Sequence, residues 1–337
     1  MEEVRSRLAS HLQDILREAL QMTPGQSALV IFDTESPLAL AFTDAYRQAL
    51  PSAHFVDIAA ITPPEALRMF DALKPGDLVV LVQSTNFRLN EFRVRLELFK
   101  RGLKTIEHTH LNRMPLEQYD AYVDALAYDP SYYRPLGAAL KAKLDAAQKI
   151  VVECADTTLV YDGAMEPSKL NVGDYTEMKN IGGTFPIGEV FTEPQALKCV
   201  NGEARVFAFA GEDHLIRLVD PFKIIIQDGI LTSPEAPAEF QAILEKIRQD
   251  EEVTLREFGL GLNPAMGKQR LVSDITAFER QKGLHFSVGA KHTIYAKPGL
   301  HRKHGRYHVD VFVDVERITI DDEPIYQNGD FCVKTMR

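Results

Sequence analysis

The first part of the chain alternates short apolar runs with segments of helical periodicity. The runs at 28–32, 54–58, 78–82 and 104–107 predict buried strands, and helical spacing lies between them at 38–50, 64–73 and 90–101. A helix over 3–20 is expected before them and another over 132–148 after them. Strands that alternate with helices are typical of a parallel α/β layer.

The second part changes to strand-rich sequence with many Gly and Asp turns. Strands are predicted at 150–161, 204–209, 222–227, 229–232, 307–315 and 318–320, and a helix at 239–248. The Asp228-Gly229 pair predicts a tight hairpin. We therefore predict an α/β protein in which an N-terminal parallel-sheet domain, 1–148, precedes an α+β, strand-rich domain, 149–337.

Composition excludes several classes of function. The 337 residues are 45% hydrophobic and 26% charged, which is typical of a globular protein. A net charge of -10 argues against nucleic-acid binding, and no apolar segment is long enough to cross a membrane. The three cysteines have no disulfide or metal spacing. We expect free thiols and a cytoplasmic protein.

Histidines concentrate near the C-terminus. Five of the ten lie within the 24 residues from His285 to His308. His301 and His304 flank Arg-Lys, and we interpret them as part of an exposed basic loop. Polar and apolar residues alternate around His308 and Asp310, so a strand would project both side chains from one face, as ligands of a divalent cation require.

Further potential ligands lie upstream of this pair. His285 belongs to another predicted strand, Glu257 precedes a predicted glycine-rich turn, and Glu189 follows a turn in Gly-Glu-Val-Phe-Thr. Two imidazoles and three carboxylates suit one or two divalent metals. We therefore expect a metal site in the second domain.

These segments together resemble the aminopeptidase T and aminopeptidase S family of metallopeptidases. The family motifs are Gly-Glu-Val-Phe-Thr, Glu before Gly-x-Gly-x-Asn, His-x-x-x-Gly and a late His-x-Asp, in this order. They match Gly188–Thr192, Glu257 with Gly259, Gly261 and Asn263, His285 with Gly289, and His308 with Asp310. The resemblance extends over about 150–315.

The resemblance implies a metalloaminopeptidase that removes N-terminal residues from small peptides or amides. It implies two divalent ions, such as zinc, cobalt or manganese, in a homodimer. The implied ligands are Glu189, Glu257, His285, His308 and Asp310. Where the family has a catalytic tyrosine this chain has His292, with Tyr295 three residues later, and Glu279 is a further candidate for proton transfer.

A more distant resemblance to dihydroxypyridine ring-opening dioxygenases leaves an alternative open. Those enzymes hold one iron(II) with two histidines and an aspartate, for which His285, His308 and Asp310 are the counterparts. They have a histidine at the position of Glu257 and lack the carboxylate of Gly-Glu-Val-Phe-Thr, whereas this chain has both glutamates. The two glutamates favour the hydrolase.

Overall fold

The structure is a computed structural model that describes residues 2–89, 92–292, 294–295 and 307–335. The expectation for His301 and His304 concerns positions outside these residues. The chain forms two compact units, and it passes between them more than once. The first contains Met1–Tyr133, Gly173–Ile187 and Arg270–Ala277; the second contains Arg134–Val172, Gly188–Gln269 and Phe278–Arg337.

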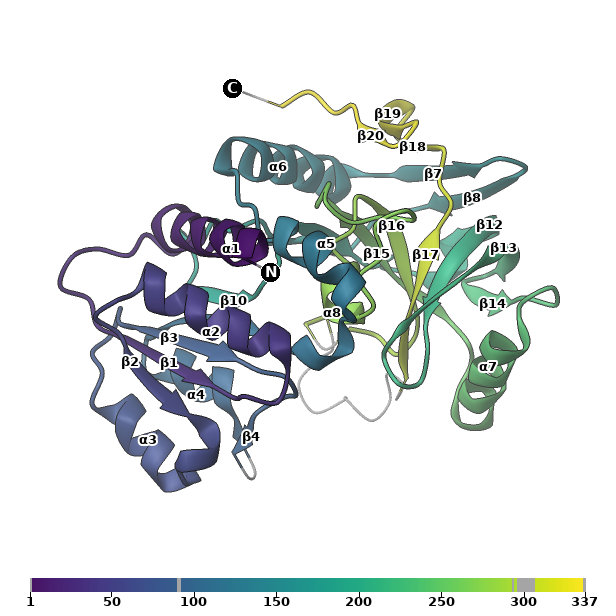
Figure 1. Ribbon diagram of the computed structural model, residues 1–337. Coiled ribbons are helices and arrows are strands. Elements are labelled where there is room, and N and C mark those ends of the chain that lie inside the picture. Colours follow the sequence, from purple (N-terminus) through teal and green to yellow (C-terminus); the bar gives the residue numbers. More distant parts are fainter. Residues whose placement is uncertain (1, 90–91, 293, 296–306, 336–337) are drawn as a thin grey trace. The chain divides into compact units, whose positions relative to one another are not determined.

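The first unit is built on a five-stranded parallel sheet (Figure 1). The order across the sheet is β10 (Gly182–Thr184), β6 (Lys104–His108), β3 (Leu78–Val82), β1 (Ala28–Phe32) and β2 (His54–Asp57). The central strands β1 and β3 are almost wholly buried, as expected for a parallel sheet with both faces covered. The predicted parallel α/β layer is confirmed. Its edge strand β10 was not predicted and comes from a segment far along the sequence.

Helices cover both faces of this sheet. On one face, Phe70 and Leu98 pack with Leu29 and Leu81, and on the other α2 lies against β1 and β3. Ser36 caps α2, because its hydroxyl accepts the amide N–H of the third helical residue. The helices are α1 (Glu2–Asp14, continued by a π-helical turn at Ile15–Ala19), α2 (Pro37–Ala49), α3 (Pro63–Asp71), α4 (Val94–Lys100) and α5 (Tyr119–Asp124). Short elements complete the list: β4 (Arg88–Leu89), β5 (Phe92–Arg93) and 3-10 turns at Ile58–Ala60, Leu111–Arg113 and Leu116–Gln118.

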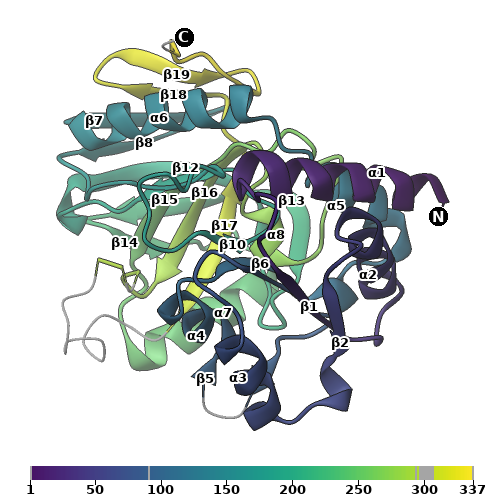
Figure 2. The ribbon, with the colours of Figure 1, turned by 90° about the vertical axis from the view of Figure 1, so that its left-hand side faces the viewer.

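The second unit is built on a large antiparallel sheet (Figure 2). The order along its main path is β20 (Asp330–Phe331), β19 (Glu323–Gln327), β18 (Arg317–Ile320), β7 (Lys149–Cys154), β8 (Thr157–Asp162), β12 (Val200–Ala210), β17 (His308–Val313), β16 (Gly283–Gly289), β15 (Leu255–Gly261), β11 (Glu189–Thr192) and β9 (Lys169–Asn171). Off this path, β13 (Ile216–Gln227) pairs with β12 and with β14 (Ile230–Thr232). The α/β fold class with a strand-rich second part is confirmed.

One predicted connection has a clear physical cause, and one predicted strand is corrected. Asp228 and Gly229 both adopt positive φ, as a two-residue hairpin turn requires, and β13 and β14 pair across them. The predicted strand at 150–161 is instead the hairpin of β7 and β8.

Helices are few in the second unit. α7 (Ala238–Asp250) covers β12 and β13, where Phe240 lies between Phe209 and Phe222. α6 (Pro130–Ala146) belongs to this unit from Arg134 onwards, and a 3-10 turn lies at Leu197–Cys199. The single turn α8 (Ile275–Phe278) belongs to the first unit up to Ala277. None of the helices in the described part of the chain is long and apolar enough to span a bilayer.

Candidate metal centre

Four neighbouring strands of the second unit, β11, β15, β16 and β17, carry the predicted ligands. Glu189 lies opposite Gly261, Gly259 lies opposite His285, and His285 lies opposite Phe312. Directly opposed residues in an antiparallel pair share a face, and residues two apart on a strand also share one. Glu189, His285 and Asp310 therefore project from the same face of the sheet.

The glycines of β15 make room for this arrangement. A Cβ atom on Gly259 would lie 2.2 Å from Nε2 of His285, so no larger residue fits beneath that imidazole. A Cβ on Gly261 would lie 1.9 Å from the carbonyl oxygen of Gln281. The glycine-rich turn expected after Glu257 was wrong: this segment is a strand, and its glycines serve close packing rather than chain reversal.

Glu257 lies two residues before Gly259 on β15 and therefore shares its face. The register between β15 and β16 shifts between Leu255 and Phe258, which marks a bulge beside Glu257. The backbone N–H of Glu257 donates to Oγ of Ser287 at 3.1 Å. This contact holds the bulge against β16 beside the ligands.

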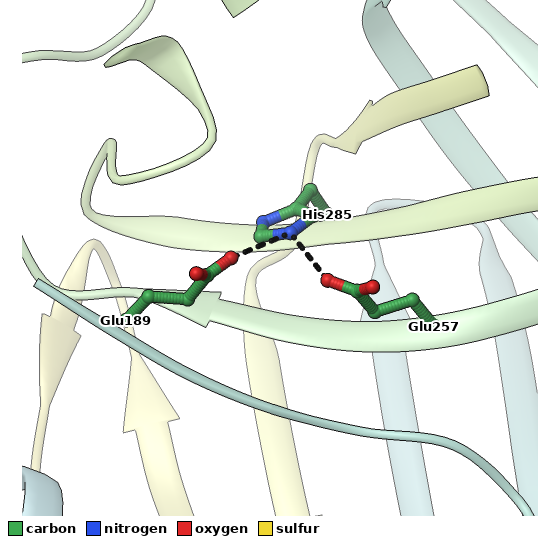
Figure 3. Close-up of side chains that lie close together, drawn as sticks. All are labelled: Glu189, Glu257 and His285. Carbon is green, nitrogen blue, oxygen red and sulfur yellow. Dashed lines mark ion pairs between the residues drawn. The ribbon is translucent and has the colours of Figure 1, made fainter. Parts of the chain in front are cut away.

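Three of the predicted ligands converge on one point (Figure 3). Nε2 of His285 lies 3.3 Å from Oε1 of Glu189 and 3.4 Å from Oε1 of Glu257. One potential ligand atom from each residue lies within 4.8 Å of the others, and all three residues are buried. The arrangement concentrates two carboxylates around one imidazole.

His308 and Asp310 form the adjoining part of the centre. Nε2 of His308 lies 3.1 Å from Oδ1 of Asp310, as expected for alternate residues on one face of a strand. The Asp310 carboxylate is buried, whereas 38% of the His308 side chain is exposed. His308 therefore lies at the solvent side of the centre.

The electrostatics show how strongly this centre favours positive charge. Burial alone would lower the pKa of His285, yet Glu189 and Glu257 outweigh it and raise the pKa to about 10. In the same way Asp310 outweighs burial and raises the pKa of His308 to about 9. Burial would raise the pKa of Glu189, but the Arg280 guanidinium and His285 lower it overall. In the absence of a metal, protons on the imidazoles supply the charge that the carboxylates require.

The residues present fit a divalent cation. Both ring nitrogens of His285 are buried without a hydrogen-bond partner among the described residues, although His285 lies at ion-pair distance from two carboxylates. Such an unpaired buried group calls for an explanation, and a metal ion would provide one. Imidazole nitrogens with carboxylate oxygens suit zinc, manganese, cobalt or iron.

The three candidates for catalysis occupy different places. His292 is half-buried, and its ring lies 6.3 Å from that of His308 between centroids. The Tyr295 hydroxyl donates to the carbonyl oxygen of Pro167 at 3.0 Å, so it is engaged with the backbone. Glu279 is in direct contact with Arg280. Of the three, His292 is the one with a described ring contact to a predicted ligand.

Two charged residues at the centre escaped the sequence analysis. Arg280 is 8% exposed, and its Nη1 lies 3.5 Å from Oε2 of Glu189. Glu193 is 1% exposed; burial, with a contribution from Glu257, raises its pKa to about 7, although the backbone N–H of His292 donates to it. Glu193 follows the Gly-Glu-Val-Phe-Thr motif directly, but nothing in the sequence signals its burial.

Comparison with known proteins places the fold. No protein-family model and no curated protein sequence matches this chain. The structure of 2,5-dihydroxypyridine dioxygenase from Pseudomonas putida KT2440 is similar, with a TM-score of 0.67 and 16% identity over 98% of both chains. AmpT from Thermus thermophilus, an aminopeptidase, is similar with a TM-score of 0.58 and 16% identity over 97% of this chain and 99% of that one. This chain therefore has the fold shared by the aminopeptidase and dioxygenase structures, as its motifs predicted.

Proposed function

We propose that this protein is a metal-dependent hydrolase of amide bonds that acts as an aminopeptidase on small peptides. The observation that carries the proposal is the convergence of Glu189 and Glu257 on His285 within 4.8 Å. A site that used only two histidines and an aspartate would have no need of two further buried carboxylates, which are costly to bury without a cation.

The ion would be held by Glu189, Glu257 and His285, with His308 and Asp310 as further potential ligands. A bound zinc, cobalt or manganese ion would polarise the scissile carbonyl and lower the pKa of a water molecule to about 7. The remaining chemistry belongs to the side chains around the centre.

His292 is suited to donate a hydrogen bond. Burial lowers its pKa, so its imidazole is neutral near pH 7. Its Nδ1 accepts the backbone N–H of Ile294 at 3.2 Å, which leaves the proton on Nε2. A neutral imidazole with Nε2–H can donate to the negative charge that develops on a carbonyl oxygen.

Glu193 is suited to hold and return a proton. Its pKa of about 7 lies near physiological pH, where a general acid and base works best. One oxygen accepts the backbone N–H of His292 at 2.6 Å, while the other, Oε2, is buried without a hydrogen-bond partner in the described part of the chain. That oxygen is the atom at which we place the proton.

The test is hydrolysis of aminoacyl anilides by chelator-treated protein reloaded with zinc, cobalt or manganese. We expect turnover that depends on the metal, is lost in Glu257→Gln and is unchanged in Glu245→Gln, which alters an exposed residue of α7. Glu193→Gln is expected to flatten the pH–rate profile near pH 7. Metal-loaded protein that hydrolyses no anilide or dipeptide would refute the proposal.

An iron(II) dioxygenase is the second candidate. It is favoured by His285, His308 and Asp310, which lie on the neighbouring strands β16 and β17 as two histidines and one carboxylate. Anaerobic loading with iron(II), followed by oxygen uptake with dihydroxypyridines or catechols, tests it. Oxygen consumption without anilide hydrolysis would replace the hydrolase by this function.

We also propose that the protein acts in the cytoplasm as a homodimer on small substrates, without nucleic acid or membrane partners. The acidic net charge supports the exclusion of nucleic acid. Sedimentation velocity at micromolar concentration tests the dimer, and a monomer would contradict it.

A further inference from the structure

A buried guanidinium, that of Arg280, lies beside the carboxylates of Glu189 and Glu279. Nη1 of Arg280 is 3.5 Å from Oε2 of Glu189, and the carboxylate of Glu279 contacts the same nitrogen. The Arg280 side chain is 10% exposed, and its Nε is buried without a hydrogen-bond partner among the described residues. Arginine stays protonated in proteins, so this positive charge is permanent.

The backbone of Arg280 is clamped in place. Its carbonyl oxygen accepts the N–H of Asn263 at 2.8 Å, and the N–H of Lys282 donates to the carbonyl oxygen of Asn263 at 3.0 Å. Gly261 packs directly against the peptide between Arg280 and Gln281. The Gly-x-Gly-x-Asn motif therefore fixes the segment that carries the guanidinium as well as making room for His285.

The position of the guanidinium conflicts with a second metal ion. In two-metal sites the ions lie about 3.5–4 Å apart and share a bridging carboxylate. Glu189 has one oxygen toward His285 and the other toward Arg280, so a second ion on Glu189 would have to occupy space beside a fixed cation. The guanidinium already supplies Oε2 of Glu189 with a positive charge, and Glu279 holds it there.

We propose that Arg280 takes the place of a second cation at Glu189, so that this centre binds one divalent ion where the family resemblance implies two. The inference rests on the proposed metal-dependent function. Glu189 then holds Arg280 through Oε2, and the single ion is bound by Glu189, Glu257 and His285, with His308 and Asp310 as further potential ligands. A hydrolytic reaction at this centre would rely on one ion and a guanidinium.

The experiment is a count of metal ions per chain in the full-length protein. Zinc-saturated protein is analysed by native mass spectrometry and elemental analysis, and manganese-loaded protein by electron paramagnetic resonance. We expect one zinc per chain and the spectrum of an isolated manganese ion. Arg280→Gln is expected to bind a second ion, with a spectrum that shows coupled manganese, while Arg280→Lys keeps the count at one.

Lys282→Gln is the matched control. It removes one positive charge two residues away, from a side chain paired with the exposed Asp330, and should leave the count at one. Two ions in the wild-type protein, or a count that stays at one in a folded Arg280→Gln protein, would overturn the inference. Should Arg280→Gln fail to fold, the wild-type and Arg280→Lys counts still decide it.

The outcomes separate this inference from the proposed function. One ion without hydrolysis rejects the hydrolase and leaves the role of Arg280 standing. Two ions with hydrolysis reject the role of Arg280 and leave the hydrolase standing. A wild-type protein that binds no ion rejects both.

Discussion

The replacement Gly259→Ala tests how the sheet prepares the metal centre. The added methyl carbon would lie 2.2 Å from Nε2 and 2.3 Å from Cε1 of His285, whereas ordinary contacts begin at 3.4 Å. His285 is fully buried, so its ring has no open space on the solvent side. The imidazole must therefore move by roughly 1 Å or the two strands must separate.

The expected magnitudes follow from this clash. Forcing an extra carbon into a packed region costs about 1–3 kcal/mol. Replacing glycine by alanine also restricts the unfolded chain, which offsets about 0.4–1 kcal/mol of that cost. Displacing a ligand from its supported position should weaken metal binding by about 10- to 100-fold, as the loss of a supporting contact does.

The assay combines urea unfolding of chelator-treated protein with zinc affinity measured against a competing chelator. Gly267→Ala is the control, because a Cβ there meets nothing within 4 Å. We expect Gly259→Ala to lose both stability and zinc affinity and Gly267→Ala to lose neither. Unchanged zinc affinity in Gly259→Ala would show that His285 is not a ligand held in this position.

Three further predictions concern the ligands and the first unit. His308→Ala should weaken zinc binding by more than about 100-fold and abolish turnover. The metal-free variant should still fold but melt at a lower temperature, because the buried Asp310 carboxylate loses its protonated partner. The exposed His214→Ala should change neither binding nor turnover, and equal zinc affinity of both variants would contradict the ligand assignment. The pKa values of His285 and His308 are raised to about 10 and about 9, so their stabilisation of the metal-free protein is fully present below about pH 6.5 and is lost as pH rises through 9 to 10. Urea unfolding in chelator at pH 7 and pH 10 checks the sign of this pH dependence. Calorimetry in buffers of different ionisation enthalpy should show about two protons released per zinc bound at pH 7. The carboxylate of Asp274 is 1% exposed and lies 2.7 Å from Nη1 of Arg113. Because Arg113→Met removes the main cation of this buried carboxylate, the free energy of unfolding should fall by about 3 kcal/mol, while zinc affinity stays unchanged. A loss of stability below about 1 kcal/mol would show that this ion pair is dispensable.

Local pattern alone predicted several features correctly. Continuous apolar runs predicted the strands β1 and β3, because a parallel sheet is buried on both faces. The alternation around His308 and Asp310 placed both side chains on one face of β17, because the side-chain period of a strand is two. Asp228-Gly229 predicted its hairpin, because few residue pairs accept two consecutive positive φ angles.

The glycine-rich segment after Glu257 shows where prediction from the local sequence pattern fails. Glycine permits turns, and it also permits close approach inside a strand, and the sequence does not distinguish the two uses. Only the pairing of β15 with β16 reveals that Gly259 lies beneath the His285 ring. The same applies to β10, whose three residues join the parallel sheet of the first unit from a segment far along the chain.

The tertiary structure also decided which side chains come together in the metal centre. The sequence determined that Glu189, Glu257 and His285 are present and in which order, but their convergence depends on the order of four strands in the sheet. Arg280 carried no motif of its own, and its burial against Glu189 arises because Gly261 and Asn263 clamp its backbone. Side-chain periodicity is a local property of the backbone and can be read from the chain, whereas strand order and register are settled by packing between distant segments, so the charge balance of the centre exists only in the folded protein.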